Sequence, residues 1–167
     1  MVRIRRISID DPLYDQECAL REDVLLSVVG WTMDDYRREM PGREERGEHF
    51  VAVASHPSGP RVVGCACLVP PEEDDSQGAG KVTQVCVDRQ RQGEGIGRQL
   101  LTTIEARAFG ELGLEQLYCH AQVDALPFYE RLGWRVTSDE FIEAGIPHRR
   151  MTLFEPTAGL PPKGSLG

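Results

Sequence analysis

Residues 85–101 read VCVDRQRQGEGIGRQLL, an apolar run followed by three closely spaced glycines and then an amphipathic segment. Ile96, Leu100 and Ile104 recur every fourth residue, which predicts a helix with one buried face. The stretch therefore predicts a strand, a glycine-rich loop and a helix in direct succession. Glycine lets the backbone approach a ligand closely, and a helix N-terminus favours an anion. We expect the loop to hold a phosphate group.

Three phosphate-binding patterns can be compared with this loop. A Walker loop requires a lysine after its last glycine, and the loop has none. A dinucleotide fingerprint requires Gly-x-Gly-x-x-Gly; Gly93 and Gly95 supply the first two glycines, but Arg98 stands at the third. The pattern Gln-x-x-Gly-x-Gly is met by Gln92, Gly95 and Gly97. We favour the third pattern and keep a nucleotide-dependent oxidoreductase as a distant alternative.

Charge separates this loop from the rest of the chain. The whole chain has 19 basic and 27 acidic residues and a formal net charge of −8. Such a field repels nucleic acids and anionic membranes, so neither is expected as a partner. Residues 81–98 instead contain four basic and two acidic residues, which indicates a local patch for phosphates.

Length and composition indicate one ordinary globular domain. The 167 residues contain no apolar run of the roughly 20 residues that a transmembrane helix needs. The N-terminus MVRIRRISIDD is charged where a signal peptide would be apolar, so we expect a cytoplasmic protein. The five cysteines lack paired zinc-site or disulfide spacings, so we expect reduced thiols and no metal.

The hydrophobic patterns predict an α/β fold. Strands are expected at 3–9, 49–55, 61–69, 81–87 and 114–121, with a final hairpin in 134–154 that turns at Gly145 to Pro147. Helices are expected at 96–108 and 125–133, and twice between Leu13 and Met40, the second starting at Thr32. This order predicts a single mixed, mostly antiparallel sheet of about 6–7 strands flanked by about 4 helices, with one parallel β-α-β unit. We expect one domain over residues 1–155 and a disordered tail over residues 156–167.

A second stretch, AQVDALPFYERLGW (121–134), places Phe128 and Tyr129 just before a turn that ends in glycine. In this order and spacing, the two stretches resemble motifs A and B of the GNAT N-acetyltransferase superfamily. The resemblance covers roughly residues 3–155. CALREDVL, EHFVAVA and FIEAGIPHRRM are further similar to the ElaA-like branch of that superfamily.

The resemblance implies the GNAT fold and an N-acetyltransferase that uses acetyl-CoA and a primary amine acceptor, without a metal. It places the pantetheine arm along Val85–Val87 and the pyrophosphate in the glycine loop, with an oxyanion donor near Val87 where the strand leaves its neighbour. Tyr129 matches the general acid of the family, and Gln122 stands where many members have asparagine. The implied cofactor-binding set is Val85, Cys86, Val87, Gln92, Gly93, Glu94, Gly95, Ile96, Gly97, Arg98 and Gln122. Homodimers are frequent in the superfamily, so the resemblance allows one.

The general base and the acceptor site are less constrained. By residue type the base candidates are His148, Glu143, Glu140, His49 and His120, or a water relay; His148 is favoured because it closes the GIPH turn shared with the ElaA-like branch. Glu140 and Glu143 fall on opposite faces of a strand, so one of them should face the acceptor. The acidic balance favours a cationic acceptor. A CoA-binding sensor without turnover is the alternative function.

Overall fold

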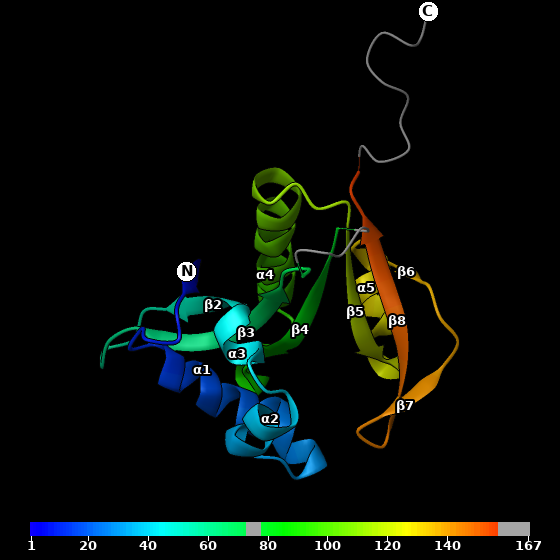
Figure 1. Cartoon of the computed structure of the whole chain (residues 1–167). Helices are drawn as coiled ribbons and strands as arrows, with labels where there is room; N and C mark the ends of the chain where they lie inside the picture. The colour runs from blue at the N-terminus through cyan, green and yellow to red at the C-terminus, as the bar shows by residue number, and fades with distance from the viewer. Residues whose placement is uncertain (73–77, 157–167) are drawn as a thin grey trace, which may run out of the picture.

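The computed structural model describes residues 1–72 and 78–156, which form one mixed sheet covered by helices (Figure 1). The eight strands of these residues follow the order β1-β2-β3-β4-β5-β8-β6, and β7 pairs with β8. All pairs are antiparallel except β4 with β5. The strands are β1 (Val2–Ile7), β2 (Glu48–Ala54), β3 (Arg61–Val69), β4 (Ala79–Val87), β5 (Gln116–Gln122), β6 (Arg135–Val136), β7 (Phe141–Glu143) and β8 (Ile146–Phe154). The predicted mixed, mostly antiparallel sheet is confirmed, and the alternating segment near the N-terminus forms its edge strand.

The helices also follow the predicted order, with one addition. They are α1 (Tyr14–Arg21) continued by η1 (Glu22–Leu26) and η2 (Ser27–Val29), α2 (Met33–Glu39), α3 (Arg43–Arg46), η3 (Arg89–Arg91), α4 (Ile96–Glu105) continued by η4 (Ala106–Glu111), and η5 (Val123–Ala125) leading into α5 (Leu126–Arg131). Helix α2 begins at Thr32, where the side chains of Thr32 and Asp35 each accept a hydrogen bond from the backbone N–H of the other residue. The short helix α3 was not predicted.

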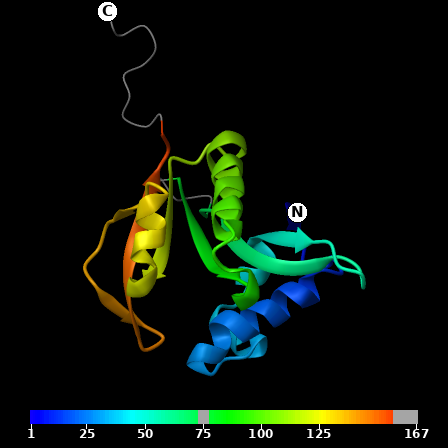
Figure 2. The same cartoon turned by 180° about the vertical axis from the view of Figure 1, so that it is seen from behind.

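Helices cover both faces of the sheet. Helix α4 and helix α5 pack on one face, and α1 packs on the other (Figures 1 and 2). The predicted stripe of α4 is buried, with Leu100 and Ile104 0% and Ile96 2% exposed. Burial of such a side chain contributes roughly 1.5–3 kcal/mol, so this stripe is a main contact between α4 and the sheet.

The last hairpin differs from the prediction. The turn lies at Ala144 and Gly145, whose φ angles are +51° and +77°, instead of Gly145 to Pro147. Two residues with positive φ form the tight hairpin turn that matches strand twist. Pro147 therefore belongs to β8, opposite Ile142. The turn comes earlier because the chain reverses where two residues accept positive φ, and a proline cannot adopt that geometry.

The described residues end at residue 156, so all but the first residue of the tail predicted at 156–167 lies outside them. Among the residues described, no helix combines the length and apolar character that crossing a membrane would require.

Candidate active site

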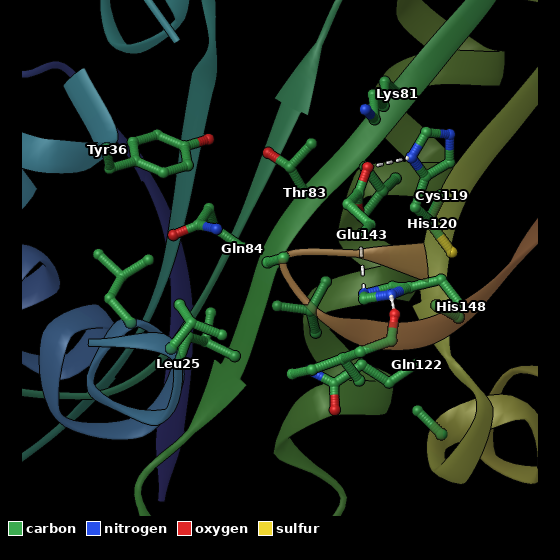
Figure 3. A pocket seen from close by; sticks show the side chains of 18 of the residues that line it. Leu25, Tyr36, Lys81, Thr83, Gln84, Cys119, His120, Gln122, Glu143 and His148 are labelled. Atoms are coloured by element: carbon green, nitrogen blue, oxygen red, sulfur yellow. Dashed lines mark hydrogen bonds and ion pairs between the residues drawn. The ribbon is translucent and has the colours of Figure 1, made fainter. Parts of the chain in front are cut away.

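Strands β4 and β5 pair only at their first residues and then separate. Their parallel register runs from Ala79 opposite Gln116 to Lys81 opposite Tyr118. Beyond that point, side chains from both strands line a cleft of about 560 Å³ (Figure 3). The expectation that the strand leaves its neighbour near Val87 was therefore wrong, because the pairing already ends at Lys81.

A bulge in β4 lies on the wall of this cleft. Gln84 has a φ of +54°, a left-handed conformation that costs about 1–3 kcal/mol for a residue other than glycine. The pairing with β3 skips Gln84 and Val85, so that both oppose one residue, Ala66. Such a bulge leaves a backbone group outside the ladder and redirects the strand. The bulge therefore places a disrupted part of the ladder, at Gln84 and Val85, on the cleft wall.

A buried ionic network holds the bulge from the α1 side. The Arg21 Nε donates to the Gln84 Oε1 at 3.0 Å. Arg21 is 0% exposed, and its Nη1 also lies 2.8 Å from Glu17 and 2.7 Å from Glu44. His49 completes the network with its Nδ1 2.9 Å from Glu17. Two carboxylates thus face two cationic groups, which makes the burial of their charge tolerable.

His49 is charged in this setting and lies outside the cleft. Burial opposes its charge, but hydrogen bonds with Cys67 and Glu17 raise its pKa to about 11. Its other ring nitrogen, Nε2, lies 2.9 Å from the carbonyl oxygen of Glu44, so both nitrogens face acceptors. His49 is therefore not in place to act as the general base that the sequence analysis considered.

The same network contains three side chains of types that can bind a metal ion. Single atoms of Glu17, His49 and Cys67 lie within 4.8 Å of one another. The Glu17 Oε2 already contacts the Arg21 guanidinium at 2.8 Å and the His49 ring at 2.9 Å. These cationic groups supply the positive charge that a metal ion would bring, so the residues do not favour one.

The glycine loop precedes the N-terminus of α4. Gly93 and Gly95 have φ angles of +84° and +82°, and a Cβ at either would meet no atom within 4 Å. Gly95 is the N-cap of α4, and no side chain caps the helix. The Gln92 Nε2 donates to the carbonyl oxygen of Val87 at 3.2 Å, which ties the loop to the end of β4. Open space beside uncapped N–H groups suits an anion, as the sequence predicts.

Other residues of the loop serve packing. Cys86 and Ile96 are 5% and 2% exposed, so only their backbones are available to a ligand. A Cβ on Gly97 would lie 3.2 Å from the Phe128 Cζ, so glycine at this position lets α4 approach α5. Gly93 and Gly95 thus form the backbone turn of the loop, and Gly97 allows the two helices to pack.

The basic patch expected around the loop is smaller than predicted. The Arg89 Nη1 binds an η1 carboxylate at 2.8 Å, and the Arg91 Nε binds Glu94 at 3.0 Å. Lys81 lies at the opposite end of β4. Arg98 is exposed and has no carboxylate partner among residues 1–72 and 78–156. Arg98 is therefore the loop cation left for a phosphate in this part of the chain.

Tyr129 stands on α5 and forms part of the cleft wall. Its ring is 7% exposed and packs edge-on against Phe128 at 5.1 Å and Trp134 at 5.4 Å. Burial raises the pKa of the Tyr129 phenol, and the neighbouring Cys119 adds to the rise. Burial likewise raises the pKa of Cys119 to about 12. The phenol therefore keeps its proton at neutral pH and is available as a donor.

Glu143, the last residue of β7, faces the cleft between two histidines (Figure 3). Its Oε1 lies 2.9 Å from the His120 Nδ1, and its Oε2 lies 3.8 Å from the His148 Nε2. The His148 Nδ1 donates to the carbonyl oxygen of Ile146 at 2.7 Å. Glu140 is exposed and does not line the cleft. One acid of the two thus faces the cleft.

The expectation that His148 closes the turn was wrong. His148 lies within β8, opposite Phe141 of β7 and Gln122 of β5, because the turn falls at Ala144 and Gly145. Gln122 and His148 both line the cleft.

The N-terminal helices contribute a wall of the cleft that was not expected from the sequence. Segments η1, η2 and α2 and the residues just after them supply apolar side chains to the cleft, namely Leu25, Leu26, Val29, Trp31 and Met40. Arg43, Lys81 and Thr83 add polar groups, and Tyr36 adds a phenol. Lys81 is the first residue of the run KVTQVCV, so its position resembles that of any lysine at the start of a strand. No local pattern places the helices beside β4.

Comparison with known proteins shows the family of this chain. Residues 31–154 match the family described as acetyltransferase (GNAT) domain. An uncharacterized N-acetyltransferase of Bacillus subtilis, YjcF, is 37% identical over 75 residues, which are 44% of this chain. The match spans 53% of that relative, about half of its length.

Solved structures show the same fold over nearly the whole chain. A protein of Lactobacillus plantarum assigned as an N-acetyltransferase is 26% identical, with a TM-score of 0.73 over 90% of this chain and 96% of that chain. Escherichia coli ElaA has a TM-score of 0.71 at 18% identity, covering 91% of this chain and 99% of that one. A GNAT family acetyltransferase from Elizabethkingia anophelis with acetyl-CoA bound has a TM-score of 0.65 at 19% identity, covering 92% and 98%. The chain belongs to the GNAT acetyltransferase domain family.

Proposed function

We propose that this protein transfers the acetyl group of acetyl-CoA to the nitrogen of a primary amine. The observation that carries the proposal is the cleft between β4 and β5, which has the uncapped glycine loop near one end and Tyr129 in its wall. A relative of the same fold has acetyl-CoA bound, which supports this donor.

The donor would lie along the open edge of β4. Unpaired backbone groups of Val85–Val87 would bind the pantetheine arm as an added strand would. The N–H groups from Gly95 onward, with Arg98, would bind the pyrophosphate. Gln122 lines the opposite wall, on β5, and would contact the same arm.

Acetyl-CoA supplies an activated thioester carbonyl when it is bound. The backbone N–H of Val85, beside the bulge, would donate to the oxygen of that carbonyl as negative charge develops on it. The Tyr129 phenol would hold its proton until the CoA sulfur leaves as a thiolate, and would then donate it. Burial raises the pKa of Tyr129 and so keeps the proton in place until then.

The incoming amine must lose a proton before it attacks. Glu143 with its partners His120 and His148 is the titratable group that faces the cleft from the β5 side. His148 is our candidate for the base, with Nε2 toward the cleft and Nδ1 fixed by the Ile146 carbonyl. Glu143 would orient the amine.

A CoA-binding protein without turnover is the competing function. The test is an acetyl-CoA turnover screen over a panel of amines, read as free thiol release, with calorimetry of acetyl-CoA binding on the same protein. We expect binding and amine-dependent thiol release. Binding without release for any amine would favour the sensor, and absence of binding would reject both functions.

A further inference from the structure

The charge inside the cleft is opposite to that of the chain. Two basic side chains, Arg43 and Lys81, line it, and Glu143 is the one carboxylate among its described lining residues. That carboxylate is already bound by His120 at 2.9 Å. The chain as a whole carries −8. The net charge of the chain therefore gives no guide to what enters the cleft.

Lys81 is held without an anionic partner. Burial lowers its pKa, and the positive charges of Arg43 and Arg150 lower it further, while Glu143 opposes them. Within residues 1–72 and 78–156 the Lys81 ammonium forms no ion pair with a carboxylate, and it lies 6.0 Å from the centre of the Tyr118 ring. A half-buried cation of this kind costs free energy unless an anion is bound beside it.

Arg43 is placed similarly. Its guanidinium interacts with the Tyr36 phenol and forms no ion pair with a carboxylate in the described part of the chain. Arg46, one turn further along α3, shows the contrast, because it is bound to Glu72 at 3.0 Å away from the cleft. Arg43 and Lys81 are thus two cationic side chains of the cleft, and neither has a carboxylate partner among the described residues.

The phosphates of acetyl-CoA would lie too far from Lys81 to be its anionic partner. Lys81 precedes Val87 by six residues of β4, and Val87 leads into the glycine loop. At about 3.3 Å per residue this is roughly 20 Å of strand. An anion beside Lys81 therefore belongs to the other reactant.

Two further features describe that reactant. Thr83, two residues after Lys81, has a buried Oγ1 without a hydrogen-bond partner within the described residues, and it lines the cleft. The wall formed by Leu25, Val29 and Trp31 is apolar. Cations, a free hydroxyl and an apolar wall together match a molecule with an anionic end and an apolar body.

We propose that the acceptor is a primary amine that carries a carboxylate, an amino acid with an apolar body. Arg43 and Lys81 bind its carboxylate, the wall of η1 and η2 contacts its body, and Glu143 faces its amine. This inference rests on the proposed acetyl transfer, and it replaces the cationic acceptor that net charge alone had favoured.

The experiment compares matched compounds that differ in the carboxylate. L-Leucine, L-phenylalanine and 4-aminobutyrate are each paired with the corresponding primary amide, with spermidine as a cationic reference. Thiol release gives kcat/KM for each, and calorimetry on the CoA-saturated protein gives affinity without requiring turnover. A charge-assisted hydrogen bond contributes about 1.5–3 kcal/mol, so for at least one pair the carboxylate should exceed its amide by roughly 10- to 100-fold.

Variants assign the preference to the two cations. We expect Lys81→Met and Arg43→Gln each to lower the carboxylate-to-amide ratio at least about tenfold, while acetyl-CoA affinity and the values for the amide stay unchanged. Arg46→Gln, on the same helix α3 but outside the cleft, should keep the ratio of the parent protein.

Equal use and equal binding of acids and amides, or a preference for spermidine, would overturn the inference. So would variants that lower acids and amides alike. Tighter binding of the acids without any thiol release would leave the anion site standing and reject acetyl transfer instead.

Discussion

Tyr129 joins two requirements in one side chain, since its ring packs in the core and the residue also lines the cleft. Because the ring contacts are with Phe128 and Trp134, phenylalanine should keep the packing and lose only the hydroxyl.

We expect Tyr129→Phe to lower kcat by about 10²–10⁴, with acetyl-CoA affinity nearly unchanged, because general acid catalysis contributes that factor. Thiol-release kinetics and calorimetry measure the two quantities. Tyr118→Phe, on β5 outside the lining of the cleft, is the control and should retain the parent kcat. An unchanged kcat for Tyr129→Phe, with chemistry limiting the rate, would remove Tyr129 from the mechanism.

Gly59 serves as a control for Gly95, because both glycines have a positive φ and Gly59 lies outside the proposed acetyl-CoA site. Gly95 and Gly59 have φ angles of +82° and +112°, and a Cβ at either would meet no atom within 4 Å. Gly59 lies in the turn between β2 and β3. Valine at either position forces a left-handed residue and should cost at least about 1–2 kcal/mol of unfolding free energy.

We expect Gly95→Val alone to weaken acetyl-CoA binding, by at least about tenfold, because its side chain would occupy the space beside the α4 N–H groups. Calorimetry and urea unfolding on both variants measure affinity and stability. Normal acetyl-CoA affinity in a folded Gly95→Val protein would contradict the assignment of the loop.

At the scale of elements, strand β4 carries most of the site. Its first residues pair with β5, its centre bulges at Gln84, and its end leads into the glycine loop. The bulge depends on contacts from a different element, because Arg21 of α1 binds the Gln84 side chain.

Two substitutions at Gln84 separate anchoring from backbone strain. Gln84→Ala removes the acceptor of the Arg21 Nε–H and keeps the strain, whereas Gln84→Gly removes both. A hydrogen bond to a charged group contributes about 1.5–3 kcal/mol, so both variants should be less stable than the parent. We expect alanine to be the less stable of the two by about 1–2 kcal/mol, because left-handed backbone penalises every residue but glycine.

Urea unfolding gives this order, and kinetics give a second readout. Both variants should lower kcat while the KM for acetyl-CoA changes little, since a less restrained bulge misplaces the Val85 N–H. An unchanged kcat in both would mean that the Arg21 contact supports only the fold.

For the whole molecule, the buried network makes stability depend on pH. The pKa of His49 is raised from 6.5 to about 11, so the folded state holds a proton that the unfolded state releases. Its stabilisation is complete below about pH 6.5 and declines as the pH rises toward 11. Burial opposes the ionisation of Glu44, but Arg21 holds its pKa below the ordinary 4.5, so this contribution is lost as the pH falls below about 4.5.

We therefore expect the free energy of unfolding to peak between about pH 4.5 and 6.5 and to fall from there to pH 7.5, which lies about one unit below the ordinary thiol pKa of roughly 8.5. Urea unfolding across this range measures the slope. His49→Gln should be less stable at pH 6 and should show a much flatter decline up to pH 7.5. Parallel curves for the two proteins would show that His49 is not protonated in the folded state.

Local patterns were enough for most elements and for the position of the glycine loop. The strand at 61–69 has the predicted limits, Thr32 starts α2 through its cap, and the glycine loop joins β4 to α4. Each of these depends on residues that are neighbours in the chain. The turn at Ala144 was missed because alanine rarely adopts positive φ, and only the pairing of β7 with β8 requires it there.

The sequence by itself determined the order of the elements, the place of the glycine loop before α4 and the position of Tyr129, because periodicity, caps and glycine spacing are local properties. Only the tertiary structure decided that Arg21 meets Gln84 across 63 residues, that β4 leaves β5 at Lys81, and that Arg43 and Lys81 share one cleft. The physical reason is that a bulge, a buried ion network and a charged cleft arise from side chains of distant segments, whose meeting is set by how the helices pack on the sheet.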